Sequence, residues 1–90
     1  MALRADTNGR TARFSLRGAV TGECDGGRLR DRVASALADG ATRIEINLGG
    51  VLFLDAAGLG DLVACRALAR RAGARLRLTG AIGKALELLR

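Results

Sequence analysis

The stretch that decides the fold runs from Val51 to Leu62 and reads VLFLDAAGLGDL. Four apolar residues lead to Asp55, and a helical pattern begins directly after it. Asp55 is predicted to be the N-cap of that helix, because its short carboxylate can accept hydrogen bonds from the free N–H groups of the first turn. Gly58 has no Cβ atom, so a neighbouring group can approach the first turn closely.

The start of this helix also suits an anion, because its unpaired N–H groups carry a partial positive charge. However, neither Ala56 nor Ala57 has a hydroxyl group, so neither residue can carry a phosphate. This absence constrains every functional interpretation of the turn.

The helix after the turn is expected to run from about Ala57 to Ala72, with Gly73 as its stop. At 3.6 residues per turn, its core stripe consists of Gly58, Leu62, Cys65 and Ala69. The neighbouring stripe has mixed character and consists of Leu59, Val63, Arg66 and Arg70. Apolar side chains beside arginines would form an edge that can bind another protein. The alternative, which spacing alone favours, is a helix flank on which the arginine stems cover the apolar side chains.

The chain before this stretch is expected to contain a hairpin, a helix and a strand. Residues 2–7 and 11–17 form the antiparallel hairpin, with a bulge at Gly18. The helix is expected to begin at Asp25 as N-cap and to end near Asp39. Its apolar stripe contains Leu29, Val33, Ala36 and Leu37, and Gly40 closes it.

The strand that follows spans residues 43–48, where apolar and polar residues alternate. Gly49 and Gly50 are expected to turn the chain, and the apolar run 51–54 is expected to be buried, as a short strand end or a packed loop. Residues 75–79 alternate as the last strand. Residues 81–90 are predicted to form an amphipathic helix with Ile82, Ala85, Leu86 and Leu89 facing inward.

This order of elements predicts an α/β fold, in which a mixed, mainly parallel sheet of about four strands has its helices on one face. A chain of 90 residues fits a single domain over residues 1–90. The other face of the sheet is then open. The residues expected to line it are Glu45, Asn47, Arg75 and Arg77.

Composition excludes several classes of function. The chain has no histidine, which removes Ser-His-Asp and Cys-His nucleophiles and histidine metal sites, and its two cysteines match no metal spacing. We therefore expect no catalytic residues, metal or cofactor, and a protein that is not an enzyme. The net charge of +6 raises nucleic-acid binding as a possibility, but the arginines are dispersed and Tyr and Trp are absent. A solvated arginine-rich surface is the favoured interpretation.

No leader sequence and no apolar run of membrane-spanning length is evident, so we expect a cytoplasmic protein without membrane insertion. The two cysteines, Cys24 and Cys65, are expected to be reduced in that compartment. The sequence does not indicate the oligomeric state.

The chain resembles STAS domains, and most closely the small bacterial anti-sigma factor antagonists. The resemblance lies in Gly22-Glu23-Cys24-Asp25, in Ile46-Asn47-Leu48 with Val51 and Phe53, in the turn Asp55-Ala56-Ala57-Gly58-Leu59-Gly60, and in the helix exit Arg70–Leu76. It covers nearly the whole chain. The family's turn reads Asp-Ser-Ser-Gly-Leu-Gly, and the serine directly after the aspartate accepts a phosphate.

The resemblance implies a protein partner, an anti-sigma factor with a kinase-like fold. In the family, the unphosphorylated antagonist binds this partner and releases a sigma factor, whereas phosphorylation abolishes binding because it adds charge to the contact surface. Carried over by position, Ala56 occupies the phosphoacceptor site. The residues implied to bind the partner are Asp55, Ala56, Ala57, Gly58, Leu59, Val63 and Arg66.

Ala56 departs from the family pattern, because alanine cannot accept a phosphate. The chain is then either an antagonist that always binds, or a STAS scaffold or transporter-associated subunit that needs no phosphorylation; an engineered serine-to-alanine change is a third explanation. A nucleic-acid-binding module is the least favoured binding function. Family members usually continue beyond the third helix, so a truncated chain is one explanation for the end at Arg90.

Overall fold

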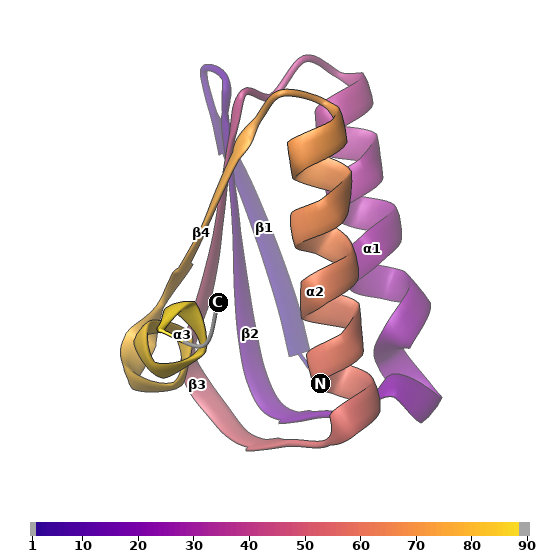
Figure 1. Cartoon of the computed structure of the whole chain (residues 1–90), viewed down its shortest axis with the longest axis vertical. Helices are drawn as coiled ribbons and strands as arrows, with labels where there is room; N and C mark the ends of the chain where they lie inside the picture. Colours follow the sequence, from indigo (N-terminus) through magenta and orange to yellow (C-terminus); the bar gives the residue numbers. More distant parts are fainter. Residues whose placement is uncertain (1, 89–90) are drawn as a thin grey trace.

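The computed structural model describes residues 2–88, with the backbone alone for residues 22–27, as an α/β domain (Figure 1). The elements are, in chain order, β1 (Ala2–Asn8), β2 (Thr11–Val20), α1 (Gly22–Ala38), β3 (Arg43–Leu54), α2 (Ala56–Arg71), β4 (Arg75–Thr79) and α3 (Gly80–Glu87). The strands form one mixed sheet in the order β1-β2-β3-β4. β1 is antiparallel to β2, whereas β2, β3 and β4 are parallel. The predicted fold class is confirmed.

The helices α1 and α2 lie side by side over one face of the sheet (Figure 1). α3 lies at the end of β4 and against the adjoining part of β3. The contact with β4 is close: a Cβ atom on Gly83 would come within 2.9 Å of the Leu78 carbonyl carbon. The carboxylate of Glu87 also accepts a hydrogen bond from the Leu78 N–H (3.1 Å). α3 is therefore held by β4 and β3 and leaves room between itself and α2.

The core lies between the sheet and the pair α1 and α2. Period-two alternation in β2 and β3 places Phe14, Leu16, Ile44, Ile46 and Leu48 on the helix side, where all are buried. Leu29 and Val33 of α1 pack on them, as the predicted stripe requires. The predicted stripe of α2 is also confirmed, because its buried residues are Gly58, Leu62, Cys65 and Ala69.

The opposite face of the sheet is open, and Glu45, Asn47, Arg75 and Arg77 line it as predicted. The hairpin and the bulge near Gly18 are also confirmed, since the β2–β3 register shifts between Gly18 and Ala19.

The predicted start of α1 is wrong. The helix begins at Gly22 with Thr21 as N-cap, so Asp25 lies inside the first turn and does not cap it. The predicted end is confirmed, with Asp39 as C-cap and Gly40 in a left-handed conformation (φ +100°).

For residues 49–54, the predicted turn and the predicted burial are wrong, whereas a strand end at residues 51–54, one of the two predicted forms, is confirmed. Gly49 and Gly50 do not turn the chain, because β3 continues through them to Leu54 and pairs with β2 as far as Val20. Within this extension only Val51 is buried, whereas Leu52 is 87% exposed and Phe53 is 56% exposed. An apolar run cannot be wholly buried in a strand that has a helix layer on only one of its faces.

The third helix begins at Gly80 and ends at Glu87. Ile82 and Leu86 pack against the core as predicted, but Ala85 is exposed and the buried position is Gly83. Leu89, which was also expected to face inward, lies outside the described residues.

Candidate functional site

The turn at Asp55 connects β3 to α2 and fixes where the helix begins. Asp55 is the N-cap, and its Oδ1 accepts a hydrogen bond from the Gly58 N–H (2.6 Å), as predicted. The Asp55 N–H donates to the Val20 carbonyl oxygen (3.3 Å), which ties the turn to the end of β2. The first turn of α2 is therefore held both by its own cap and by the neighbouring strand.

Gly58 explains how α2 can begin so close to the sheet. A Cβ atom at this position would lie 2.4 Å from the Val20 carbonyl oxygen and 3.1 Å from Leu54 Cδ1. Because one of these neighbours is a backbone atom, no rotamer change relieves the contact. Gly58 is buried, and the absence of a side chain there permits this packing.

Ala56 and Ala57 are exposed on the first turn of α2. A side chain at either position is accessible from solvent, next to the free N–H groups of the helix start. The methyl groups present here offer neither charge nor a hydrogen bond.

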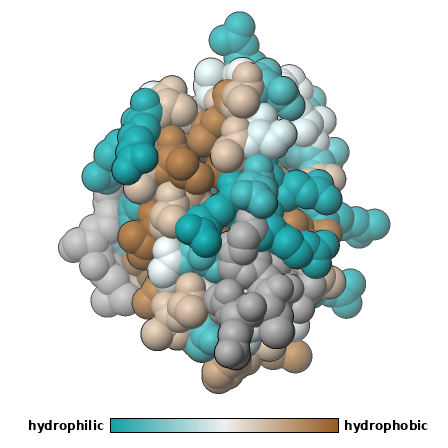
Figure 2. Space-filling view, turned by 90° about the vertical axis from the view of Figure 1, so that its right-hand side faces the viewer, coloured by the Kyte–Doolittle hydropathy of each residue, from teal (hydrophilic) through white to brown (hydrophobic). Residues whose placement is uncertain are grey.

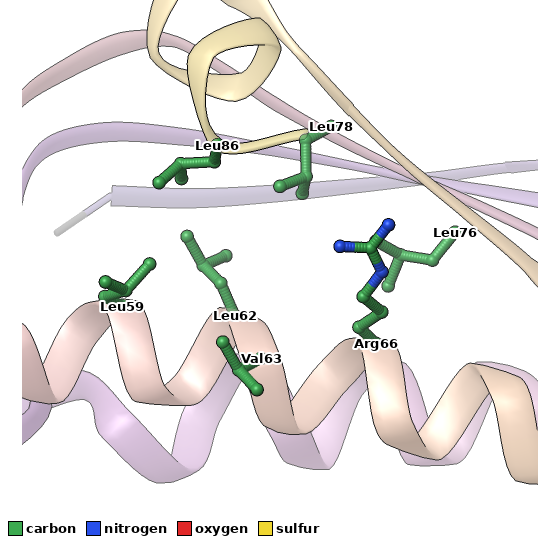
Figure 3. Close-up of a pocket in the computed structure, with 7 residues that line it drawn as sticks. All are labelled: Leu59, Leu62, Val63, Arg66, Leu76, Leu78 and Leu86. Atoms are coloured by element: carbon green, nitrogen blue, oxygen red, sulfur yellow. The ribbon is translucent and has the colours of Figure 1, made fainter. Parts of the chain in front are cut away.

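The mixed stripe of α2 borders an apolar cavity of about 230 Å³ between α2, β4 and α3 (Figure 3). The residues that line it are Leu59, Leu62, Val63, Arg66, Leu76, Leu78 and Leu86. In Figure 3, Leu59 and Leu62 extend from α2 toward Leu78 and Leu86 on the other side. Six of the seven side chains are apolar, so the cavity suits an apolar group. Val63 is 60% exposed and Leu59 is 37% exposed, so the arginine stems do not cover these side chains.

Arg66 is the charged residue of this cavity. Its guanidinium extends from α2 toward β4 and lies beside Leu76 (Figure 3). Within residues 2–88 it forms no hydrogen bond or ion pair. A half-buried cation at the edge of an apolar cavity can pair with a carboxylate that arrives next to an apolar group. Arg70, the last member of the stripe, is exposed and borders a different hollow with Gly73 and Ala74.

Two of the exposed apolar residues, Leu59 and Val63, lie on α2. Figure 2 shows brown residues in a band left of centre, with teal residues above it and on the right-hand flank. Sequence reasoning missed Leu76, Leu78 and Leu86 as members of the site, because they lie on β4 and α3 and approach α2 only through the packing of these elements. It also missed the exposed pair Leu52 and Phe53. The period-two alternation of β3 carried past Gly50 could have revealed Phe53, whereas the exposure of Leu52 follows from shifts of the β2–β3 register that the sequence does not show.

The remaining reactive group near the site is Cys65, which is buried and free. Burial, with a smaller contribution from Asp61, raises the pKa of its thiol to about 12, although Arg30 acts in the opposite direction. At neutral pH the thiol stays protonated and is a poor nucleophile. Asp61 is itself ion-paired with Arg30 of α1 (3.2 Å), so this cluster joins the two helices.

Other kinds of site are not supported by the described part of the chain. Residues 2–88 contain no group of His, Cys, Asp and Glu side chains placed to hold a metal ion. None of the helices described there combines the length and apolar character needed to cross a bilayer.

Comparison with known proteins supports a common fold. A family model described as "Mlab, STAS domain" matches residues 3–90. No curated protein has a sequence that matches the chain. The unphosphorylated form of the anti-sigma factor antagonist SpoIIAA superposes with a TM-score of 0.77 at 21% identity, over 97% of this chain and 83% of that one.

Two further solved structures agree with this result. The phosphorylated form of SpoIIAA, described as a Bacillus cell fate determinant, has a TM-score of 0.75 at 21% identity, over 97% of this chain and 82% of that one. An anti-sigma factor antagonist from Mycobacterium paratuberculosis has a TM-score of 0.73 at 19% identity, over 97% of this chain and 75% of that one. At these identities the structural matches establish the fold.

Proposed function

The chain belongs to the STAS domain family, and on that premise we propose that it is a protein-binding regulator of the anti-sigma factor antagonist type. It binds an anti-sigma factor with a kinase-like fold and thereby releases a sigma factor, in the cytoplasm and without enzymatic activity of its own. The observation that carries the proposal is the exposed apolar stripe, Leu59 and Val63, directly beside the Asp55 turn. Two of the structural relatives are forms of an anti-sigma factor antagonist.

The proposed contact surface consists of the Asp55 turn with Ala56 and Ala57, followed by Leu59, Val63 and Arg66 on α2. The partner places an apolar side chain in the cavity of about 230 Å³ and a carboxylate near Arg66. Protein interfaces favour this arrangement, in which a desolvated apolar centre is bordered by arginine. Gly58 supports the surface from beneath, since it is buried.

The proposed regulation differs from that of the family because residue 56 is alanine. A phosphoserine at an exposed position of the first turn would bring roughly two negative charges into the contact surface. Alanine removes this switch, so the chain stays competent to bind and is controlled by its abundance or by its partner.

The test is retention of a kinase-fold anti-sigma factor from extract of the source cell, identified by mass spectrometry. Val63→Asp is compared with Ala67→Asp, because both residues are exposed on α2 and the substitutions carry the same charge. We expect Val63→Asp to lower retention at least tenfold, whereas Ala67→Asp should have little effect. Ala56→Ser should bind at first and then be phosphorylated and released when ATP is added.

Two results would contradict this function. Equal retention of the Val63 and Ala67 variants would remove the proposed surface, and failure of both the native chain and Ala56→Ser to retain such a kinase would remove the proposed partner. The second candidate function is a STAS scaffold or transporter-associated subunit, which is favoured by Ala56, since a scaffold needs no phosphoacceptor. Retention of a transporter ATPase on the same α2 surface would support it.

A further inference from the structure

The open face of the sheet carries a dense array of arginines that the proposed partner site does not use. Strand register places on this face the residues Arg4, Arg13, Arg17, Arg43, Arg75 and Arg77, together with Asp6 and Glu45. Six cations against two carboxylates leave four of the chain's six net positive charges on one face. The charge that looks dispersed along the sequence is therefore concentrated by the fold.

Little of this charge is neutralised within the molecule. Arg13 and Glu45 form an ion pair on the open face, with 2.9 Å between Nε and Oε1. Within residues 2–88, Arg17, Arg75 and Arg77 are exposed, and their guanidinium groups have no hydrogen bond or ion pair. The face therefore presents unpaired guanidinium groups to whatever approaches it.

An apolar side chain stands at one end of this face. Leu52 is 87% exposed, and it borders a shallow hollow with Ala2, Arg17, Gly18 and Gly50. Leu52 is the extra residue of a β-bulge, because Val51 pairs with Gly18 whereas Phe53 pairs with Ala19, the next residue of β2. The hollow that Leu52 borders is shared with Arg17, which lies on the open face. Leu52 therefore extends from the same surface as the arginines.

We propose that the open sheet face docks on an anionic lipid surface, with the arginines at the headgroups and Leu52 in the interface. Arginines near an anionic leaflet are attracted to it, and an exposed leucine among them adds apolar burial. A protein partner fits less well, because a protein interface has a desolvated apolar centre, and the middle of this face carries arginines, carboxylates and polar side chains instead. Single-stranded nucleic acid would need a row of aromatic side chains on which successive bases stack, whereas the chain has two aromatic residues, the buried Phe14 and the exposed Phe53. Duplex nucleic acid would leave the apolar side chain of Leu52 without a partner.

The test is flotation of the full chain with vesicles of phosphatidylcholine and phosphatidylglycerol, compared with pure phosphatidylcholine vesicles. Binding is expected only to the anionic vesicles and should fall as salt is added. Arg75→Gln/Arg77→Gln should weaken it about 25-fold, since each arginine near such a surface contributes about fivefold. The matched control is Arg28→Gln/Arg32→Gln, which removes the same charge from exposed positions on α1 and should change binding less than twofold.

The contribution of Leu52 is tested separately. Leu52→Ser should weaken vesicle binding several-fold, whereas Val63→Ser, on the α2 side, should leave it unchanged. All substituted side chains are exposed, and unchanged thermal unfolding checks that the variants remain folded.

Three results would overturn the proposal. The first is an equal loss of vesicle binding in the two double-arginine variants, which would show that the vesicles attract the net charge of the chain and not this face. The second is binding that does not respond to Leu52→Ser. The third is binding to a short DNA duplex, at the same salt concentration, without binding to anionic vesicles.

Discussion

The two faces of the sheet differ in character, although the same strands make both. On the helix side, Ile44 and Ile46 are fully buried under α1 and α2. On the open side, their neighbour Arg43 is exposed, and their neighbour Glu45 forms an ion pair with Arg13 of β2. Side-chain alternation thus gives the molecule one face that provides stability and one that remains available for contact. The predictions below test this division.

The largest effect is expected from a cavity in the buried face. Ile46→Ala should lower the free energy of unfolding by about 2–5 kcal/mol, because it removes buried methyl groups that the surrounding core cannot replace. Arg77→Ala, on the open face, should change it by less than about 0.5 kcal/mol. Urea unfolding followed by circular dichroism gives both values, and similar losses would contradict the division between the faces.

Gly58→Ala should be the next most damaging change. Its Cβ atom would meet the Val20 carbonyl oxygen, so we expect a loss of about 3 kcal/mol, as for other overpacked sites. The control is Gly60→Ala in the same helix, where nothing lies within 4 Å and a gain of about 0.5–1 kcal/mol is expected. If both glycines responded alike in denaturant unfolding, close packing of α2 on β2 would be refuted.

Cys65 should make stability fall at alkaline pH. Its pKa is raised from 9.0 to about 12, so between these values the unfolded chain loses the thiol proton and the folded chain keeps it. The contribution of the protonated thiol to stability is complete below about pH 9 and falls above it, by about 3 kcal/mol at pH 11. Cys65→Ala should lack this component, so parallel pH curves for the two proteins would contradict the burial effect.

Removal of the α2 cap should have a smaller effect. Asp55→Ala is expected to lower the free energy of unfolding by about 1 kcal/mol, because the Gly58 N–H loses its acceptor. Asp55→Asn keeps a side-chain oxygen in place and should retain most of the stability. If the asparagine variant lost as much stability as the alanine variant, the capping hydrogen bond would not be the source of the stability that Asp55 provides.

The smallest effect is expected for the ion pair on the open face. Arg13→Gln removes the contact of 2.9 Å with Glu45, yet the loss in thermal unfolding experiments should be below about 0.5 kcal/mol, because water screens an exposed pair. A loss above 1 kcal/mol would show that this face also contributes to stability.

Sequence reasoning succeeded where the governing interactions are local. The cap at Asp55, the buried stripe of α2 and the end of α1 at Gly40 follow from helix period and capping chemistry. It failed for Asp25, because the helix starts a turn earlier at Gly22. It also failed at residues 49–54, because a glycine pair resembles a turn unless the neighbouring strand is known.

By itself, the sequence determined the order of strands and helices, the α2 cap and the alternation that separates core from surface, since each depends on residues a few positions apart. Only the tertiary structure decided which surfaces these elements make together. The apolar cavity needs Leu86 of α3 to face Leu59 of α2, and the arginine array needs four strands in register. Both depend on side chains far apart in the chain, and their proximity follows from how the layers pack and not from any local preference.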